Sequence, residues 1–231
     1  MKDPLTCTIT DVIPRTPTIT SFRMTPDRPF DFLPGQFMKV HIAEGLWRYL
    51  SISSSPAKPY LEVTKRITGS DFSAALKRIK AGDRITVEGP LGKFVYKEEY
   101  QKIGFLIGGI GITPVMSILG YLADKGLAAD CVLLYSNRTV EEVAFAAELE
   151  SLSKQNPRIK IVNTITGEMP QGGGQLCGVI DREMVSQVLP DHHERIFFLC
   201  GPPKMVECTQ ALLLGLGQET EKIKTENFVG Y

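Results

Sequence analysis

The stretch IGFLIGGIGITPVMSILGYL, residues 103–122, decides the architecture of this chain. A short apolar run leads into a turn with glycines at 108, 109 and 111, and an apolar segment of helical length follows from Pro114 to Lys125. Glycines allow a sharp turn, and Thr113 as N-cap with Pro114 at the first helical position is typical of a helix start. The stretch is therefore predicted to be strand, turn and helix, and its glycines argue against a membrane span.

The alternation of apolar strands and helices continues to the C-terminus. Strands are predicted at 104–109, 131–136, 159–165 and 195–200, and helices at 114–125, 140–154, 182–189 and 203–214. Such alternation predicts a doubly wound parallel sheet with helices on both faces. We expect an α/β domain over residues 98–231.

The first 97 residues follow a different period. Short alternating strands separated by Pro and Gly turns are predicted at 6–13, 18–24, 36–42, 48–53, 60–67 and 83–88. One helix is predicted at 72–79, with Ser70 or Asp71 as its N-cap. Several short strands at this spacing indicate an antiparallel β-barrel domain over residues 1–97.

The amino-acid composition excludes several classes of function. The 26 Lys and Arg residues balance 26 Asp and Glu without a long basic run, so no nucleic-acid partner is expected. Five widely spaced cysteines without a C-x-x-C pair argue against a disulfide framework, a zinc site or an iron–sulfur cluster, and we expect no metal. No signal peptide is visible at the N-terminus, which favours a cytoplasmic location.

The glycine turn at 108–111 has two interpretations. Backbone amides and the helix dipole at this place could bind a pyrophosphate, or the turn could connect strand and helix without any ligand. Taken alone, the turn favours neither.

Five short motifs occur in order along the chain: RYLSISSSP at 48–56, GSDFS at 69–73, GPLG at 89–92, CGPP at 200–203 and ENF at 226–228. Together they resemble the ferredoxin–NADP reductase superfamily over residues 5–231. The resemblance implies a flavin-binding barrel that holds FAD rather than FMN, and a second domain that binds NADH or NADPH. Hydride would pass between the nicotinamide and flavin N5. Without a fused iron–sulfur domain, electrons would go to or from a separate acceptor: ferredoxin, another redox subunit, free flavin or a ferric complex.

The resemblance also assigns flavin-binding residues. Arg48 would offer a forked cation to the pyrophosphate, and Ser51 would place a hydroxyl near N5. Leu50 stands where the family usually stacks a tyrosine, so Leu50→Tyr is expected to tighten flavin binding. Lys65 could add charge or lie on a solvated strand face. The whole expected set is Arg48, Tyr49, Leu50, Ser51, Lys65, Gly69, Ser70, Ser73, Phe228 and Tyr231.

On the nicotinamide side, the resemblance places Cys200 and Thr113 near the ring and returns Glu226 to the flavin. Ser51, Cys200 and Glu226 are the expected catalytic residues. Cys200 could instead be a small buried residue, and the C-terminal residues a frayed tail. The expected nucleotide-binding set is Gly109, Gly111, Thr113, Pro114, Ser136, Arg138, Gly201 and Pro202.

Two choices remain open from the sequence. Ser136 and Arg138 suit the 2′-phosphate of NADPH, but Arg138 could equally contact the ribose or the diphosphate of NADH. The chain could also be a non-catalytic dinucleotide-sensing or scaffold subunit on the same fold, although such a subunit would not need groups placed for hydride transfer.

Overall fold

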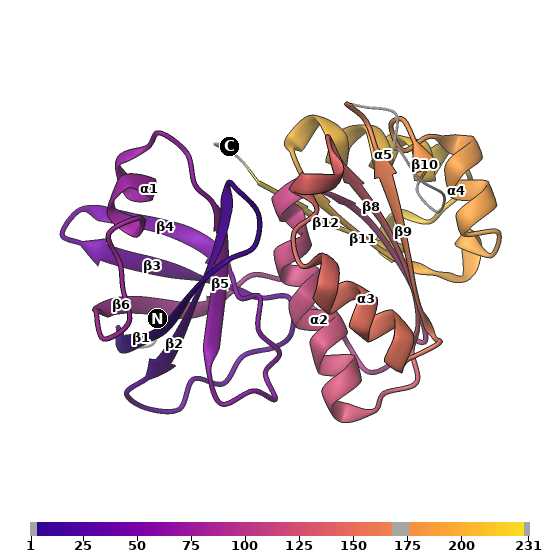
Figure 1. The fold of residues 1–231 in the computed structure, drawn as a ribbon. Coiled ribbons are helices and arrows are strands. Elements are labelled where there is room, and N and C mark those ends of the chain that lie inside the picture. Colours follow the sequence, from indigo (N-terminus) through magenta and orange to yellow (C-terminus); the bar gives the residue numbers. More distant parts are fainter. Residues whose placement is uncertain (1–3, 168–175, 229–231) are drawn as a thin grey trace. The chain divides into compact units, whose positions relative to one another are not determined.

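The computed structural model describes residues 4–167 and 176–228 (Figure 1). It divides into two compact units. The barrel unit comprises Met1–Tyr96 and Thr113–Lys125, and the sheet unit comprises Lys97–Ile112 and Gly126–Tyr231. Most of helix α2 (Ile112–Lys125) therefore belongs to the barrel unit, although its sequence lies beyond the barrel strands.

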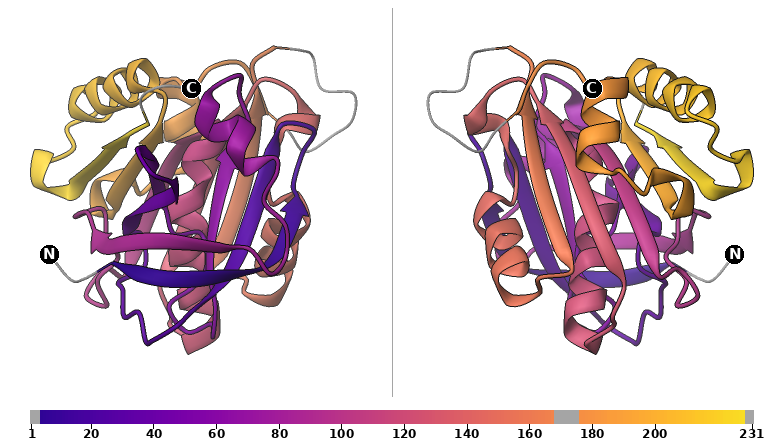
Figure 2. Two further views of the ribbon diagram at one scale, coloured as in Figure 1. Left: turned by 90° about the vertical axis from the view of Figure 1, so that its left-hand side faces the viewer. Right: turned by 90° about the vertical axis from the view of Figure 1, so that its right-hand side faces the viewer.

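The barrel unit is built on a six-stranded antiparallel half-barrel with the strand order β4-β3-β6-β1-β2-β5 (Figures 1 and 2). The strands are β1 (Leu5–Pro14), β2 (Ile19–Pro26), β3 (Phe37–Ala43), β4 (Leu46–Ser51), β5 (Leu61–Arg66) and β6 (Arg84–Leu91). The two outer strands approach each other where Ile52 bridges Val63. The predicted antiparallel barrel is confirmed.

Alternating apolar residues of these strands form the barrel core, and helix α1 (Asp71–Leu76) packs against it through Phe72 and Leu76. Ser70 is the N-cap, because its side chain accepts a hydrogen bond from the Ser73 amide. The predicted helix at 72–79 is shorter than expected, ending at Leu76.

The sheet unit contains a six-stranded parallel sheet with the order β10-β9-β8-β7-β11-β12. Its strands are β7 (Lys102–Gly108), β8 (Asp130–Asn137), β9 (Ile159–Ile165), β10 (Leu176–Cys177), β11 (Ile196–Gly201) and β12 (Ile223–Asn227). The direction of winding reverses at β7, which lies between β8 and β11. The predicted doubly wound sheet is confirmed, while β10 and β12 were not predicted.

Within the described residues of the sheet unit, three α-helices flank this sheet. Helices α4 (Arg182–Val188) and α5 (Pro203–Gly215) pack on one face, and α3 (Ala146–Gln155) lies beside β9 on the other (Figure 1). The continuous helix predicted at 140–154 is wrong. A short 3-10 helix, η2 (Val140–Glu142), comes first, and Phe145 adopts a left-handed conformation with φ of 60° that an α-helix cannot contain.

Arg195 joins three strands at the amino edge of the sheet. Its Nη1 donates to the carbonyl oxygen of Ile103 at 3.1 Å and to Asp130 Oδ1 at 2.6 Å, at the starts of β7 and β8. Its Nε and Nη2 bind the Asp191 carboxylate at 2.7 and 3.0 Å. The guanidinium is almost fully buried, so these partners are needed to offset its desolvation.

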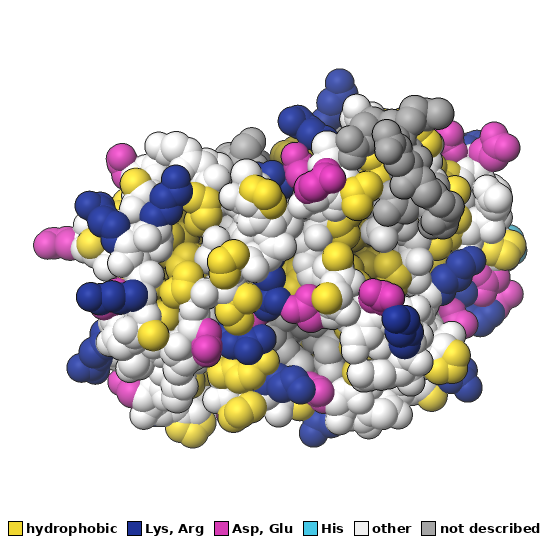
Figure 3. Space-filling view, in the orientation of Figure 1, with side chains coloured by type: hydrophobic (Ala, Val, Ile, Leu, Met, Phe, Trp, Pro, Cys, Tyr) yellow, Lys and Arg dark blue, Asp and Glu magenta, His cyan; other side chains and the backbone are white. Residues whose placement is uncertain are grey.

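Charges are mixed on the surface that Figure 3 shows. Basic and acidic side chains are interspersed there rather than gathered by sign. Among the described residues, no helix is both long enough and apolar enough to cross a membrane.

Candidate active site

Two cations lie on the two outer strands of the barrel sheet, close enough for the charge of one to act on the other. Arg48 on β4 is exposed, and its guanidinium carbon lies 5.6 Å from the centre of the Phe72 ring. Lys65 on β5 is only 5% exposed, so the solvated strand face considered for it is wrong. Burial lowers the pKa of Lys65, and the charge of Arg48 lowers this pKa further. A bound anion would relieve both effects.

Hydroxyl groups gather at the start of α1, which packs against β3 and β4. The Thr68 amide donates to Ser73 Oγ at 3.1 Å, and Thr68 Oγ1 donates to Ser70 Oγ at 3.1 Å. Between them, Gly69 has open space where a side chain would stand, because an added Cβ would meet nothing within 4 Å. Cations, hydroxyls and free space beside a glycine fit a diphosphate. Sequence reasoning missed Thr68, although its hydroxyl directly precedes the Gly69-Ser70 pair.

The structure separates Tyr49 from the cation pair. Tyr49 is 53% exposed and makes edge-on ring contacts with Phe37 and Trp47, at centroid distances of 5.5 and 5.4 Å. These rings cover the face of β4 opposite to the one that carries Arg48 and Leu50. The aromatic side chain next to Arg48 is instead Phe72.

Leu50 lies in the core of the barrel unit. It is 4% exposed and belongs to the barrel core together with Phe72. The expected gain in flavin affinity from Leu50→Tyr came from the ring that relatives stack on the flavin, and it stays a prediction. In the structure a tyrosine at this position would have to enter a filled core.

Ser51 ends β4 and is 4% exposed, and the residues after it are held by β5. Ser53 Oγ donates to Glu62 Oε1 at 3.0 Å, and the Glu62 amide donates to Ser54 Oγ at 3.0 Å. The Glu62 carboxylate is also paired with Arg23 Nε at 2.8 Å. This buried network fixes the segment Ser51–Ser55.

In the sheet unit, two turns meet where the strand order reverses. A Cβ added at Gly111 would clash with the carbonyl oxygen of Cys200, and one at Gly108 would clash with Met205 Sδ. Gly201, with φ of 152°, lies against the Gly108 backbone. The glycines are therefore required for the turns after β7 and β11 to pack together, at the position where doubly wound sheets bind ligands.

The predicted N-cap role of Thr113 is wrong. The 3-10 helix η1 (Gly109–Gly111) continues directly into α2, so Thr113 is the second residue of that helix and Pro114 the third. A helix that is already preceded by helical residues has no N-cap at this position. Thr113 is 1% exposed and lies in the barrel unit.

Cys200 and Glu226 lie opposite each other on β11 and β12. Cys200 is fully buried; burial raises the pKa of its thiol, and the Glu226 charge raises this pKa further. The Phe228 amide donates to the Gly201 carbonyl oxygen at 3.0 Å. Glu226 and Phe228 are thus held by strand pairing, so the frayed-tail alternative is wrong for them. Tyr231 lies outside the described residues.

The end of β8 lies next to the glycine turn. Ser136, which is partly exposed, pairs in register with Gly108, and Arg138 is exposed. Between them, Asn137 is 4% exposed, and its side-chain nitrogen and oxygen have no hydrogen-bond partner among the described residues. An unpaired buried amide indicates a missing polar partner. Burial is not visible in sequence, and Asn137 was not predicted.

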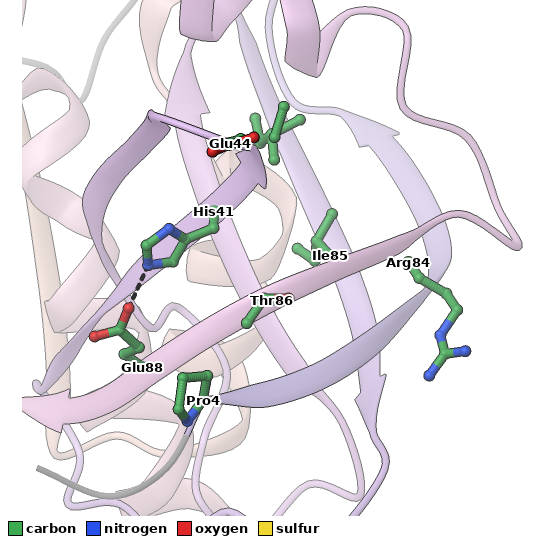
Figure 4. A pocket seen from close by; sticks show the side chains of 9 residues that line it. Pro4, His41, Glu44, Arg84, Ile85, Thr86 and Glu88 are labelled. Carbon is green, nitrogen blue, oxygen red and sulfur yellow. Dashed lines mark ion pairs between the residues drawn. The ribbon is translucent and has the colours of Figure 1, made fainter.

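The barrel unit also has a surface pocket of about 400 Å³ that contains none of the predicted site residues (Figure 4). Inside it, His41 Nε2 forms an ion pair with Glu88. Its lining comprises Pro4, His41, Ile42, Ala43, Glu44, Arg84, Ile85, Thr86 and Glu88. No cluster of metal-ligating side chains occurs within residues 4–167 and 176–228.

Comparisons with known proteins agree with this arrangement. The family description "Oxidoreductase FAD-binding domain" matches residues 7–96, and "Oxidoreductase NAD-binding domain" matches residues 105–211. The fold and site thus define an oxidoreductase with one domain for FAD and one for a nicotinamide dinucleotide. The chain belongs to the oxidoreductases that combine these two domain families, and its fold is also that of a ferredoxin–NADP reductase from Neisseria gonorrhoeae, with a TM-score of 0.83 at 24% identity over 98% of this chain and 99% of that one.

The curated relatives include reductase components of monooxygenases. A glycine betaine monooxygenase reductase subunit from Pseudomonas aeruginosa is 32% identical over 94% of this chain and 62% of its own length. A propane 2-monooxygenase reductase component from Mycolicibacterium goodii is 32% identical over 87% of this chain and 61% of its own. The chain thus spans about three fifths of these relatives.

Among solved structures, the fold is similar to the flavohem-like FAD/NAD binding domain of a nitric oxide dioxygenase from Vibrio cholerae O1 biovar El Tor. The TM-score is 0.88 at 24% identity, over 98% of this chain and 99% of that one.

Proposed function

We propose that this chain is a flavin-dependent NAD(P)H oxidoreductase, with FAD bound by residues 1–97 and NADH or NADPH bound by residues 98–231. The observation that carries the proposal is the pair of cations Arg48 and Lys65 on the two outer strands of a matched FAD-binding domain, near the hydroxyls of Ser70 and Ser73. The relatives that are reductase components support a separate electron acceptor.

Different residues of the barrel unit would bind FAD through different groups. Arg48 can donate two parallel hydrogen bonds to phosphate oxygens, and the buried Lys65 adds a point charge that water screens little. Ser70 and Ser73 supply hydroxyl groups, and Gly69 leaves room for the phosphates to approach the backbone. When bound, FAD supplies the acceptor for a hydride from the reduced nicotinamide.

The sheet residues bind and orient the nicotinamide dinucleotide. The paired turns at 108–111 and 201–202 offer backbone groups at the switch point of the sheet. The thiol of Cys200 remains protonated at neutral pH because its pKa is raised, so Cys200 contributes shape and polarity rather than a nucleophile. Glu226, held opposite Cys200, is the acidic group of the proposed catalytic set with Ser51.

The end of β8 carries the groups proposed to contact the part of the nucleotide in which NADH and NADPH differ. Exposed Arg138 and partly exposed Ser136 are the groups that would meet a 2′-phosphate, and the unpaired amide of Asn137 is a polar group for the nucleotide edge. Arg138 could equally bind the ribose or diphosphate of NADH, so both nucleotides belong in the test.

The acceptor is a separate redox protein or small molecule: ferredoxin, another redox subunit, free flavin or a ferric complex. All five cysteines are free thiols, which is typical of a reducing compartment and supports a cytoplasmic location.

One experiment tests the proposal. Protein reconstituted with FAD is mixed anaerobically with NADH or NADPH, and the absorbance of the oxidised flavin is followed. We expect bleaching with at least one nucleotide. Failure of both nucleotides to bleach it would support the alternative, a non-catalytic dinucleotide-sensing or scaffold subunit.

A further inference from the structure

Helix α2 is hydrogen-bonded to the segment Ser51–Ser55 at the end of β4, which we call the serine segment. Ser117 Oγ donates a 2.7 Å hydrogen bond to the carbonyl oxygen of Ser54, and both serines are buried. The residues are 63 positions apart in the sequence, and both belong to the barrel unit. The bond therefore ties a helix to a strand end within one compact body.

The contact continues along the helix. One turn after Ser117, a Cβ placed at Gly120 would lie 3.3 Å from Ser55 Cβ, so the backbones approach closely there. One further turn along, Asp124 Oδ1 lies 2.7 Å from Lys58 Nζ. The helix and the serine segment thus run side by side in the same direction.

Toward their amino-terminal ends, helix α2 and the serine segment lead to residues of the proposed reaction centre. Thr113 is four residues before Ser117 and lies on the same face of α2, about 6 Å along the helix axis. Ser51 is three residues before Ser54 on the partner segment. The paired segments therefore bring Thr113, assigned to the nicotinamide side, and Ser51, assigned to the flavin side, to the same end of this contact.

Ser54 is held from its other side as well. Its side-chain oxygen accepts a hydrogen bond from the Glu62 amide on β5, while its carbonyl oxygen accepts the one from Ser117. Without the Ser117 hydroxyl, Ser54 would remain fastened to β5 but would lose this bond to the helix.

We infer that Ser117 is a positioning residue for hydride transfer, because its bond to Ser54 sets the spacing between Thr113 and Ser51. The inference rests on the proposed function. Hydride transfer depends steeply on the distance between donor and acceptor, so a small shift of either side reduces the rate more than the affinity. Ser117 itself need not touch either cofactor.

The test is stopped-flow reduction of the FAD-reconstituted full chain by NADH and NADPH. For Ser117→Ala we expect the limiting rate of flavin reduction to fall about tenfold, with less than a threefold change in the Kd of either cofactor. The kinetic isotope effect with deuterated nucleotide should rise and become more temperature-dependent. A purely structural role would leave the isotope effect of the folded protein unchanged.

Two further variants make the test independent of one substitution. Gly120→Ala adds a methyl group against Ser55 while favouring the helix, so it should also slow reduction. Lys58→Met removes the more exposed ion pair of the same contact and should keep the wild-type rate. Ser117→Thr, which keeps the hydroxyl, should recover most of the rate.

The outcomes are distinct. Wild-type rate and isotope effect in both Ser117→Ala and Gly120→Ala would overturn the inference and leave the reductase function intact. Equal losses in Lys58→Met would also overturn it, since any weakening of the contact would then suffice. A wild-type protein that neither nucleotide reduces would overturn the proposed function and the inference together.

Discussion

The guanidinium carbon of Arg48 lies 5.6 Å from the centre of the Phe72 ring, which brings a cation of β4 to the beginning of α1. Phe72 is fully buried, so it gives the arginine a fixed apolar support. The position of Arg48 therefore depends on the packing of α1 and not on β4 alone.

Arg48→Ala should weaken FAD binding by roughly ten- to a hundredfold, because charge-assisted hydrogen bonds contribute about 1.5–3 kcal/mol each. Fluorescence titration of the protein without flavin measures this. Arg84→Ala removes a cation from another barrel strand and serves as the matched control, with no change expected. Equal affinities for wild type and Arg48→Ala would remove this side chain from the site.

Leu50→Tyr should destabilise the barrel unit by about 1–3 kcal/mol, because the larger side chain must enter a filled core. Urea unfolding of the protein without flavin measures the change. Leu50→Met, which nearly conserves volume, should cost less. A tyrosine variant that is as stable as the wild type and binds FAD more tightly would show that position 50 faces the ring after all.

Ser51→Ala and Cys200→Ala should each slow anaerobic flavin reduction about tenfold, which corresponds to roughly 1.4 kcal/mol in the barrier. Groups that orient the reacting rings act mainly on the chemical step, so cofactor affinities should change little. Cys208→Ala, at an exposed cysteine, is the control. Stopped-flow rates at saturating nucleotide decide the matter, and wild-type rates in either variant would exclude that residue from the mechanism.

Asp191→Asn should lower the free energy of unfolding by about 1–2 kcal/mol at pH 7. Burial alone would raise the pKa of Asp191, but hydrogen bonds from Arg195 and Lys102 outweigh burial and lower it to about 2. A carboxylate with a lowered pKa stabilises the fold above its unfolded pKa near 4, and this stabilisation is lost as the pH falls toward 2.

Urea unfolding at several pH values tests the prediction for Asp191. The difference between wild type and Asp191→Asn should be largest at pH 5–7 and should shrink below pH 4. Glu194→Gln is the control, since that carboxylate is 58% exposed and its pair with Lys102 contributes little. A difference that stayed constant down to pH 2 would contradict the assigned charge interaction.

Local patterns in the sequence were sufficient for much of the architecture. The apolar run at 103–107 before three glycines predicted the first parallel strand and its turn, and Ser70 was among the predicted N-caps of the first helix. Such features depend on neighbouring residues along the chain, which is why they can be found without the structure. Two strands were not predicted: β10, which is very short, and β12, which is polar. Pairing with a neighbouring strand, rather than local propensity, makes each of them a strand.

The sequence alone thus determined the two-part architecture and most residues assigned to the sites, through periodicity, turn chemistry and ordered motifs. Tertiary structure decided where those residues lie and which of them are buried. Burial of Lys65 and Leu50 depends on strands and a helix that fold over them. Thr113 is not an N-cap because the 3-10 helix η1, whose Gly111 packs against Cys200, runs directly into α2. The bond from Ser117 to Ser54 joins segments 63 residues apart. Contacts of this kind form only when the chain has folded, because no local pattern encodes which distant group will lie within hydrogen-bonding distance.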